Sequence, residues 1–295
     1  MTGAIYDIGY RGYDGPRLGR RGALRALFTA GLRAVYGLGR PFRSKIWPFG
    51  AVLLAVLPAL IAVALPALLS QGGGPDAAEF IQLFTYDTYL WQVGGLLPLF
   101  LAAQAPELVI SDRRYQVLPL YFSRPIHRAD YLVARWASLA VGLLALTLVP
   151  LLVLWIGTVL LDADVVGAAA DEAGALPQII ATGLLYAAVL SIIALAISAY
   201  AGRRAYGSGA VIALFLVGGA LGGLLSSASG GSDWAVMLDP LAVLDGTRDW
   251  LFGGPVQEAP AASSSLPLWT FGAVAGGYVV AAAAALAWRY RSDGS

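Results

Sequence analysis

The 295-residue chain contains no cysteine, one histidine (His127) and one lysine (Lys45). The absence of cysteine excludes a disulfide framework, a zinc–thiolate site and a cysteine nucleophile. A single histidine excludes a His-based metal cluster and the paired histidines of a membrane metalloprotease. Lys45 follows Ser44 and not a glycine, so the chain has no P-loop for ATP. We therefore expect a non-catalytic chain that binds no cofactor of its own.

Charged residues are also scarce. They make up 13% of the chain, about half the share found in soluble domains, while 58% of the residues are hydrophobic. A helix needs about 20 apolar residues to cross roughly 30 Å of hydrocarbon. Six segments meet that length: residues 47–69, 88–110, 136–161, 176–201, 205–225 and 267–288. The sequence therefore predicts an all-α integral membrane protein with six transmembrane helices in a domain over residues 47–295.

The second of these segments is the least apolar. It contains Gln92, Pro98, Gln104, Pro106 and Glu107. Kinked spans with polar residues are tolerated when they face other helices or a cavity and not lipid. We therefore expect this span to lie inside the helix bundle.

Residues 1–46 precede the first span and contain nine of the 19 basic residues. From Leu24 to Leu38, apolar residues recur every three or four positions and arginines flank them, which predicts an amphipathic helix ended by Pro41. Such a helix suits the plane of the membrane interface, with its arginines among lipid phosphates. The alternative is an ordinary amphipathic helix packed on protein.

The basic residues are distributed unevenly between the two sides of the predicted membrane. Eighteen of the 19 fall in the N-terminal segment, in loop 107–135, between spans four and five, and after span six. The opposite connections contain only Arg248 among twelve acidic residues, which include Asp164 and Asp245. The positive-inside rule then predicts a multi-pass protein of the plasma membrane, with both termini and loop 107–135 in the cytoplasm.

The longest outer connection, residues 226–266, has an amphipathic part broken by Pro240 and Gly246. It predicts either short helices that dip toward the membrane or form a small outer cap, or an extracellular loop with a hydrophobic turn. Small residues in spans five and six have the spacing of close helix contacts. These candidates are Gly218 with Gly222, Gly219 with Gly223, and Gly272 with Gly276.

Loop 107–135 carries five arginines and the only histidine, and it is the one large charged segment between apolar spans. Its central run is Leu120-Tyr121-Phe122-Ser123-Arg124-Pro125-Ile126-His127-Arg128. This run and the predicted topology resemble the type-2 ATP-binding-cassette permeases, the membrane subunits that pair with a separate ATPase. At two places the chain departs from the family pattern, at residues 116–119 and 134–135.

The resemblance implies the membrane-spanning subunit of an exporter. Its partners would be an ATP-binding-cassette ATPase, which binds the ATP, a second permease copy or a homologous permease, and the lipid bilayer; no nucleic-acid partner is expected. It also implies a coupling element with a short helix near residues 111–120. The residues assigned to ATPase coupling are Glu107, Arg113, Arg114, Arg124, Pro125, His127 and Arg128.

Other readings remain open. Ser123 before Arg124-Pro125 could end one cytosolic helix, with Asp130 capping the next. The protein could be an ion-coupled secondary carrier, although the spans lack the ionisable residue at mid-membrane that such carriers usually have. It could also be a membrane enzyme or a non-transporting scaffold that recruits a cytosolic protein.

Overall fold

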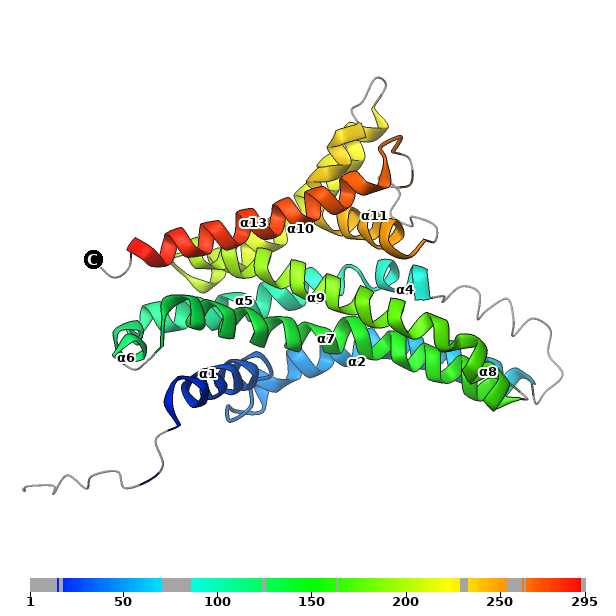
Figure 1. Ribbon diagram of the computed structural model, residues 1–295, viewed down its shortest axis with the longest axis horizontal. Helices are drawn as coiled ribbons and strands as arrows, with labels where there is room; N and C mark the ends of the chain where they lie inside the picture. Colours follow the sequence, from blue (N-terminus) through cyan, green and yellow to red (C-terminus); the bar gives the residue numbers. More distant parts are fainter. Residues whose placement is uncertain are drawn as a thin grey trace, which may run out of the picture.

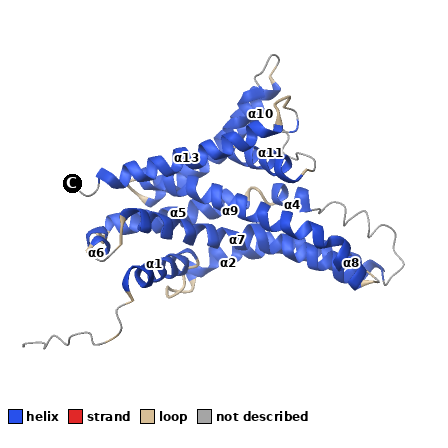
Figure 2. Cartoon of the chain, in the orientation of Figure 1, coloured by secondary structure: helices blue, strands red, loops and turns tan. Residues whose placement is uncertain are grey.

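The computed structural model describes residues 15, 18–70, 86–123, 126–162, 164–228, 233–253, 262 and 264–292. Within these ranges all regular secondary structure is helical, as Figure 2 shows, and the all-α prediction is confirmed. The elements are α1 (Gly19–Val35), α2 (Arg43–Ser70), α4 (Tyr86–Gln92), α5 (Leu96–Arg114), α6 (Leu118–Phe122), α7 (Arg128–Leu161), α8 (Val165–Asp171), η1 (Glu172–Gly174), α9 (Ala175–Tyr200), α10 (Arg204–Ser227), η2 (Asp233–Leu238), α11 (Pro240–Phe252) and α13 (Leu268–Ser292).

Five helical segments of the described chain are long and apolar enough to cross a membrane. They are Arg43–Leu65, Arg128–Leu161, Val165–Tyr200, Arg204–Ser227 and Leu268–Arg291. Helices α2, α7 and α9 run along the longest dimension of the molecule, and α10 rises at an angle to them (Figure 1). This arrangement is that of a multi-pass membrane protein.

The sequence predicted one continuous transmembrane helix over residues 88–110, but the structure has two helices there. Helix α4 ends at Gln92, a turn follows at residues 93–95, and α5 begins at Leu96 and continues to Arg114. The turn contains Gly94 and Gly95, which disfavour helix. Pro98 lies in the first turn of α5, where a missing N–H costs no helical hydrogen bond. The glycine pair and the proline together explain why the helix is interrupted and restarts there.

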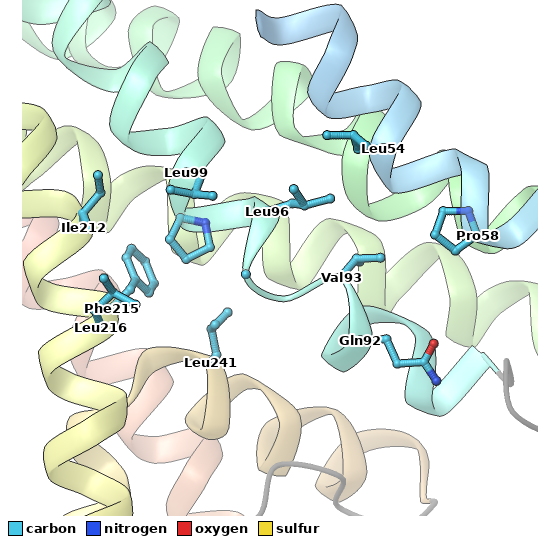
Figure 3. A pocket seen from close by; sticks show the side chains of 12 residues that line it. Leu54, Pro58, Gln92, Val93, Leu96, Leu99, Ile212, Phe215, Leu216 and Leu241 are labelled. Carbon is cyan, nitrogen blue, oxygen red and sulfur yellow. The ribbon is translucent and has the colours of Figure 1, made fainter.

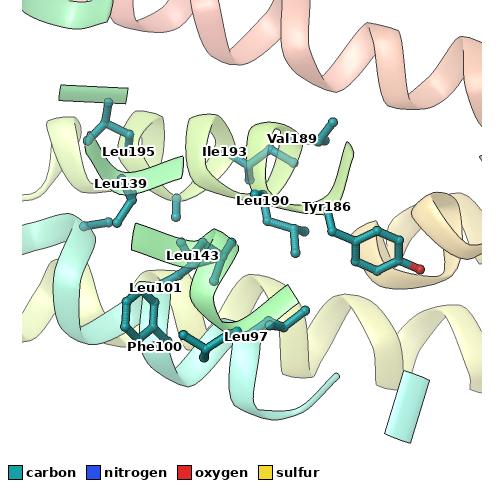
Figure 4. Close-up of a cluster of buried hydrophobic side chains, with 14 of the residues drawn as sticks. Leu97, Phe100, Leu101, Leu139, Leu143, Tyr186, Val189, Leu190, Ile193 and Leu195 are labelled. Atoms are coloured by element: carbon teal, nitrogen blue, oxygen red, sulfur yellow. The ribbon is translucent and has the colours of Figure 1, made fainter. Parts of the chain in front are cut away.

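The core lies where α5, α7 and α9 meet. Leu97 and Phe100 of α5, Leu139 and Leu143 of α7, and Leu190 of α9 are buried together (Figure 4). Small residues allow close approach at the edges of this core. A Cβ atom on Gly157 of α7 would come within 2.6 Å of a methyl carbon of Val63 in α2. Helix α2 therefore packs closely on α7 at the edge of this core.

Helix α1 packs on α7. Leu27, Gly31 and Val35 are buried along one face, and the Ser138 hydroxyl of α7 donates to the carbonyl of Phe28 at 2.9 Å. A Cβ atom on Gly31 would overlap the Ser138 side chain. Helix α7 thus covers part of the apolar face of this amphipathic helix, and the position of the helix at the membrane interface stays a prediction.

Helix α10 packs on the short helices that follow it. Cβ atoms on Gly218 and Gly222 would lie 2.5 and 3.1 Å from the carbonyl oxygens of Leu238 and Ala235 in η2. A Cβ atom on Gly272 of α13 would lie 2.6 Å from the ring of Trp250 in α11. A Cβ atom on Gly276 would have no neighbouring atom within 4 Å. Of the six predicted contact glycines, Gly218, Gly219, Gly222 and Gly272 therefore lie against residues 235–250, in the connection between α10 and α13 of this same chain.

Candidate functional site

One end of the bundle gathers most of the charged residues. Helices α2, α7 and α10 begin there, α5, α9 and α13 end there, and α1 and α6 lie beside them (Figure 1). The described basic residues lie on these helix ends or on α1 and the turn after it, with the exception of Arg248 in α11. We call this the basic end.

Glu107 lies at the centre of the basic end and is only 6% exposed. One carboxylate oxygen pairs with Arg40 and the other pairs with Arg204. Arg40 follows α1 and Arg204 begins α10, so a single carboxylate in α5 joins three separate segments. Both arginine side chains remain about half exposed.

A second buried group fixes the end of α5 to the start of α7. The Tyr131 hydroxyl donates to Asp112 at 2.7 Å, and the guanidinium of Arg135 pairs with the same carboxylate oxygen. Arg135 also lies over the Tyr131 ring, 5.4 Å from its centroid. Arg135 is only 5% exposed, so its side chain is shielded from solvent. The carboxylate of Asp112 balances the buried charge of Arg135.

The chain that carries Asp112 forms a short projection, residues 111–123, which we call the hook. Gln116 adopts a left-handed conformation with φ of 52°, and α6 then begins with Pro119 in its first turn. The expected helix over 111–120 is therefore split: α5 runs to Arg114, and α6 covers Leu118–Phe122. Leu118 is buried, whereas Tyr115 and Leu120 are 71% and 67% exposed. The hook thus presents apolar groups on a base that is held firmly.

Two arginines assigned to coupling bind helix ends of their own chain. Arg113 donates to the carbonyl of Ala199 at 2.7 Å, at the end of α9. Arg128 donates to the carbonyls of Tyr290 and Arg291 at 2.9 and 2.8 Å, at the end of α13. Cationic side chains commonly satisfy the last carbonyls of a helix in this way. These contacts hold both side chains against helix ends of the same chain.

The other assigned residues differ in exposure. Arg114 is exposed beside the ring of Tyr115. His127 is exposed, and its backbone N–H donates to Asp130 at 3.0 Å at the start of α7. Arg124 and Pro125 lie outside the described residues.

The sequence did not predict which arginines pair with Glu107 and Asp112. Arg40 and Arg204 are far from Glu107 in sequence, and no local pattern links them. Asp112 and Arg135 are separated by 23 residues, and pairing them requires knowing that the hook folds back between α5 and α7.

An apolar pocket of about 550 Å³ lies beside the break between α4 and α5 (Figure 3). Leu54 and Pro58 of α2 form one wall, and Phe215 and Leu216 of α10 form another. Gln92 supplies an amide at its edge. Pockets of this size and character take small apolar molecules with one or two polar groups.

Helix α11, one of the short helices that the sequence allowed in residues 226–266, contains buried charged residues. Asp245 and Arg248 form an ion pair at 2.8 Å, with side chains 1% and 3% exposed. Asp239 caps α11 by accepting from the backbone N–H of Leu241 at 2.9 Å, and burial raises the pKa of its carboxyl group. The outer connection is therefore a packed structural element over residues 233–253.

No protein-family model matches the chain, and no curated protein is similar enough to be matched.

Proposed function

We propose that this chain is the membrane-spanning permease subunit of an ATP-binding-cassette exporter, driven by a separate cytosolic ATPase. The observation that carries the proposal is the hook. It projects from the basic end, exposes Tyr115 and Leu120, and is fixed at its base by the buried group of Asp112, Tyr131 and Arg135. A surface that transmits force needs exposed apolar groups for the partner and a rigid connection to the membrane helices.

The proposed topology has six crossings. The interrupted pair α4–α5 serves as the second crossing beside the five apolar segments. The basic end then faces the cytoplasm by the positive-inside rule, with both termini on that side. Six crossings make half of a translocation unit, so a second copy or a homologous permease completes it.

Two routes connect the hook to the helices. Asp112 and Arg135 join the hook to α7, and Glu107 joins α5 to Arg204 at the start of α10. When the ATPase moves the hook, α5 pulls on both helices at once. Such a switch requires that the ATPase bind two conformations of the permease with different affinities.

The apolar pocket supports a hydrophobic cargo. It lies between α2, α5 and α10, and the last two of these are joined by the Glu107–Arg204 pair. A movement of α10 relative to α5 would therefore change the width of the pocket. This links the proposed energy source to the proposed binding site.

One observation favours the ion-coupled carrier as a second candidate. The buried Asp245–Arg248 pair on α11 is a pair of ionisable groups in an apolar environment, as coupled carriers require. It lies outside the five apolar segments, and the charges balance. Transport by the purified chain, driven by an ion gradient and abolished by Asp245→Asn, would establish this candidate instead.

The test of the permease function is Leu120→Glu, which puts a charge on the exposed tip of α6. We expect co-purification of the ATPase to fall by roughly tenfold or more, since a charge in an apolar contact must be desolvated without a partner. The matched control is Val166→Glu in α8, which is 82% exposed at the opposite end. Unchanged ATPase binding by Leu120→Glu, with the protein correctly inserted, would contradict the proposed docking surface.

A further inference from the structure

A second cavity, of about 890 Å³, opens at the basic end between α5, the hook and the start of α10. Four arginines from three segments line it: Arg40, Arg114, Arg203 and Arg204. We propose that this cavity binds a phosphate group, carried either by the headgroup of an anionic lipid or by a free phosphate compound.

The lining of the cavity carries more positive than negative charge. Glu107 and Asp112 are the acidic groups in its lining. Glu107 is shared between two guanidinium groups, and Asp112 is paired with Arg135 from behind the wall. Arg114 and Arg203 are then left with no carboxylate partner among the described residues. The lining therefore has an excess of positive charge that an anion would balance.

The donors suit phosphate. A guanidinium group presents several N–H donors in a planar fork that matches the oxygens of a phosphate, and several such groups can surround one phosphate from different sides. Arg114 comes from the end of α5 and Arg203 from the residue before α10. Tyr121, which also lines the cavity, brings a hydroxyl that can donate to the same group.

The position allows both sources of the phosphate. The cavity is polar and lies at the end of the bundle, where free phosphate compounds have access from water. It also adjoins the start of α10, a helix with large apolar side chains exposed along its length, including Leu216 and Leu224. An acyl chain can lie along that surface while its headgroup enters the cavity.

The experiment uses the purified full-length chain in detergent. The chain has no cysteine, so Tyr206→Cys gives a single labelling site. Position 206 is 66% exposed, two residues after Arg204, and it is not part of the cavity lining, so an environment-sensitive dye there does not fill the cavity. The probes are short-chain phosphatidic acid and inorganic phosphate, and native mass spectrometry of the unlabelled protein counts the bound molecules.

Binding should weaken by roughly tenfold or more in Arg114→Gln/Arg203→Gln, because two charge-assisted contacts are lost. The control is Arg21→Gln/Arg25→Gln, which removes the same charge from the exposed side of α1 and should change the affinity by less than about twofold. Saturable binding of phosphatidic acid alone identifies a lipid headgroup. Equal binding of inorganic phosphate identifies a free phosphate compound. The proposal would be overturned if neither probe bound in the fluorescence measurement or in native mass spectrometry. An equal loss of binding affinity in the two double variants would also overturn it.

Discussion

Arg20 and Asp130 form an ion pair with two hydrogen bonds. Nε and Nη2 of the guanidinium donate to the two carboxylate oxygens at 2.8 and 2.7 Å, across 110 residues of sequence. This bond to Asp130 raises the pKa of the Arg20 guanidinium above its usual value. It fixes the first turn of α1 to the first turn of α7. The amphipathic helix is therefore a fixed part of the basic end.

The contact between α1 and α7 depends on a small residue at position 31. In Gly31→Val the new side chain would meet the Ser138 side chain, where even a Cβ atom would lie 2.8 Å from the serine Cβ. We expect a loss of about 1 to 3 kcal/mol in the free energy of unfolding, typical of overpacking. Thermal unfolding in detergent measures it. Gly50→Ala, where a Cβ has no atom within 4 Å, serves as the control and should not be destabilising.

The carboxylate of Glu107 balances two arginines, so its removal leaves like charges near one another. Glu107→Gln should lower the free energy of unfolding by about 1 to 2 kcal/mol. Removing one partner of a fully buried ion pair costs roughly 3 to 5 kcal/mol. We expect a smaller loss here because the side chains of Arg40 and Arg204 are about half exposed. The melting temperature of the purified protein measures it. Asp171→Asn, an exposed acid at the opposite end, should leave the melting temperature unchanged.

Tyr36 gives the protein a specific response to alkaline pH. Its hydroxyl donates to the carbonyl of Gly142 at 2.7 Å, and burial raises its pKa from 10.0 to about 12. Above pH 10 the unfolded chain releases a proton that the folded chain keeps, so stability must fall as the pH rises from 10 toward 12. The slope is about 1.4 kcal/mol per pH unit for one proton. Wild type should therefore lose stability faster than Tyr36→Phe between pH 10 and 11.5, and parallel curves would contradict the assignment.

The two ends of the bundle should lie on opposite sides of the membrane. Single cysteines at Leu120 in α6 and Val166 in α8 can be labelled, because both side chains are well exposed. Asp245 is unsuited to this test, as it is 1% exposed. A membrane-impermeant thiol reagent added to intact cells should label position 166 and not position 120. The reverse pattern would refute the proposed orientation.

The sequence predicted the helical class and five of the apolar segments, because both depend on local composition. It did not predict the interruption at Gly94 and Gly95, since hydropathy over residues 88–110 averages across a turn. It also did not predict that Arg113 and Arg128, which it assigned to ATPase coupling, donate to carbonyls at the ends of α9 and α13; the coupling role of both residues stays a prediction. Local sequence cannot show which helix ends meet, and these contacts depend on that.

The coupling residues named from the sequence stay a prediction, and the structure adds exposed apolar side chains beside them. Three of the five arginines in loop 107–135, Arg113, Arg128 and Arg135, contact groups of their own chain, while Tyr115 and Leu120 expose apolar side chains next to the exposed Arg114. A charged loop suggests a charged contact, but exposure is decided by folding. We therefore expect the contact with the ATPase to be centred on the hook, which includes Arg114.

The most direct test of the permease function is photo-crosslinking from the hook in living cells. A photoreactive amino acid at position 120, with position 166 as the control, is irradiated, and the adducts are identified by mass spectrometry. The account predicts that position 120 yields an adduct with an ATP-binding-cassette ATPase and that position 166 does not. It also predicts that the purified chain, freed of that ATPase, hydrolyses no ATP, since it lacks a P-loop. An adduct that contains no such ATPase, together with transport by the purified chain alone, would contradict the account.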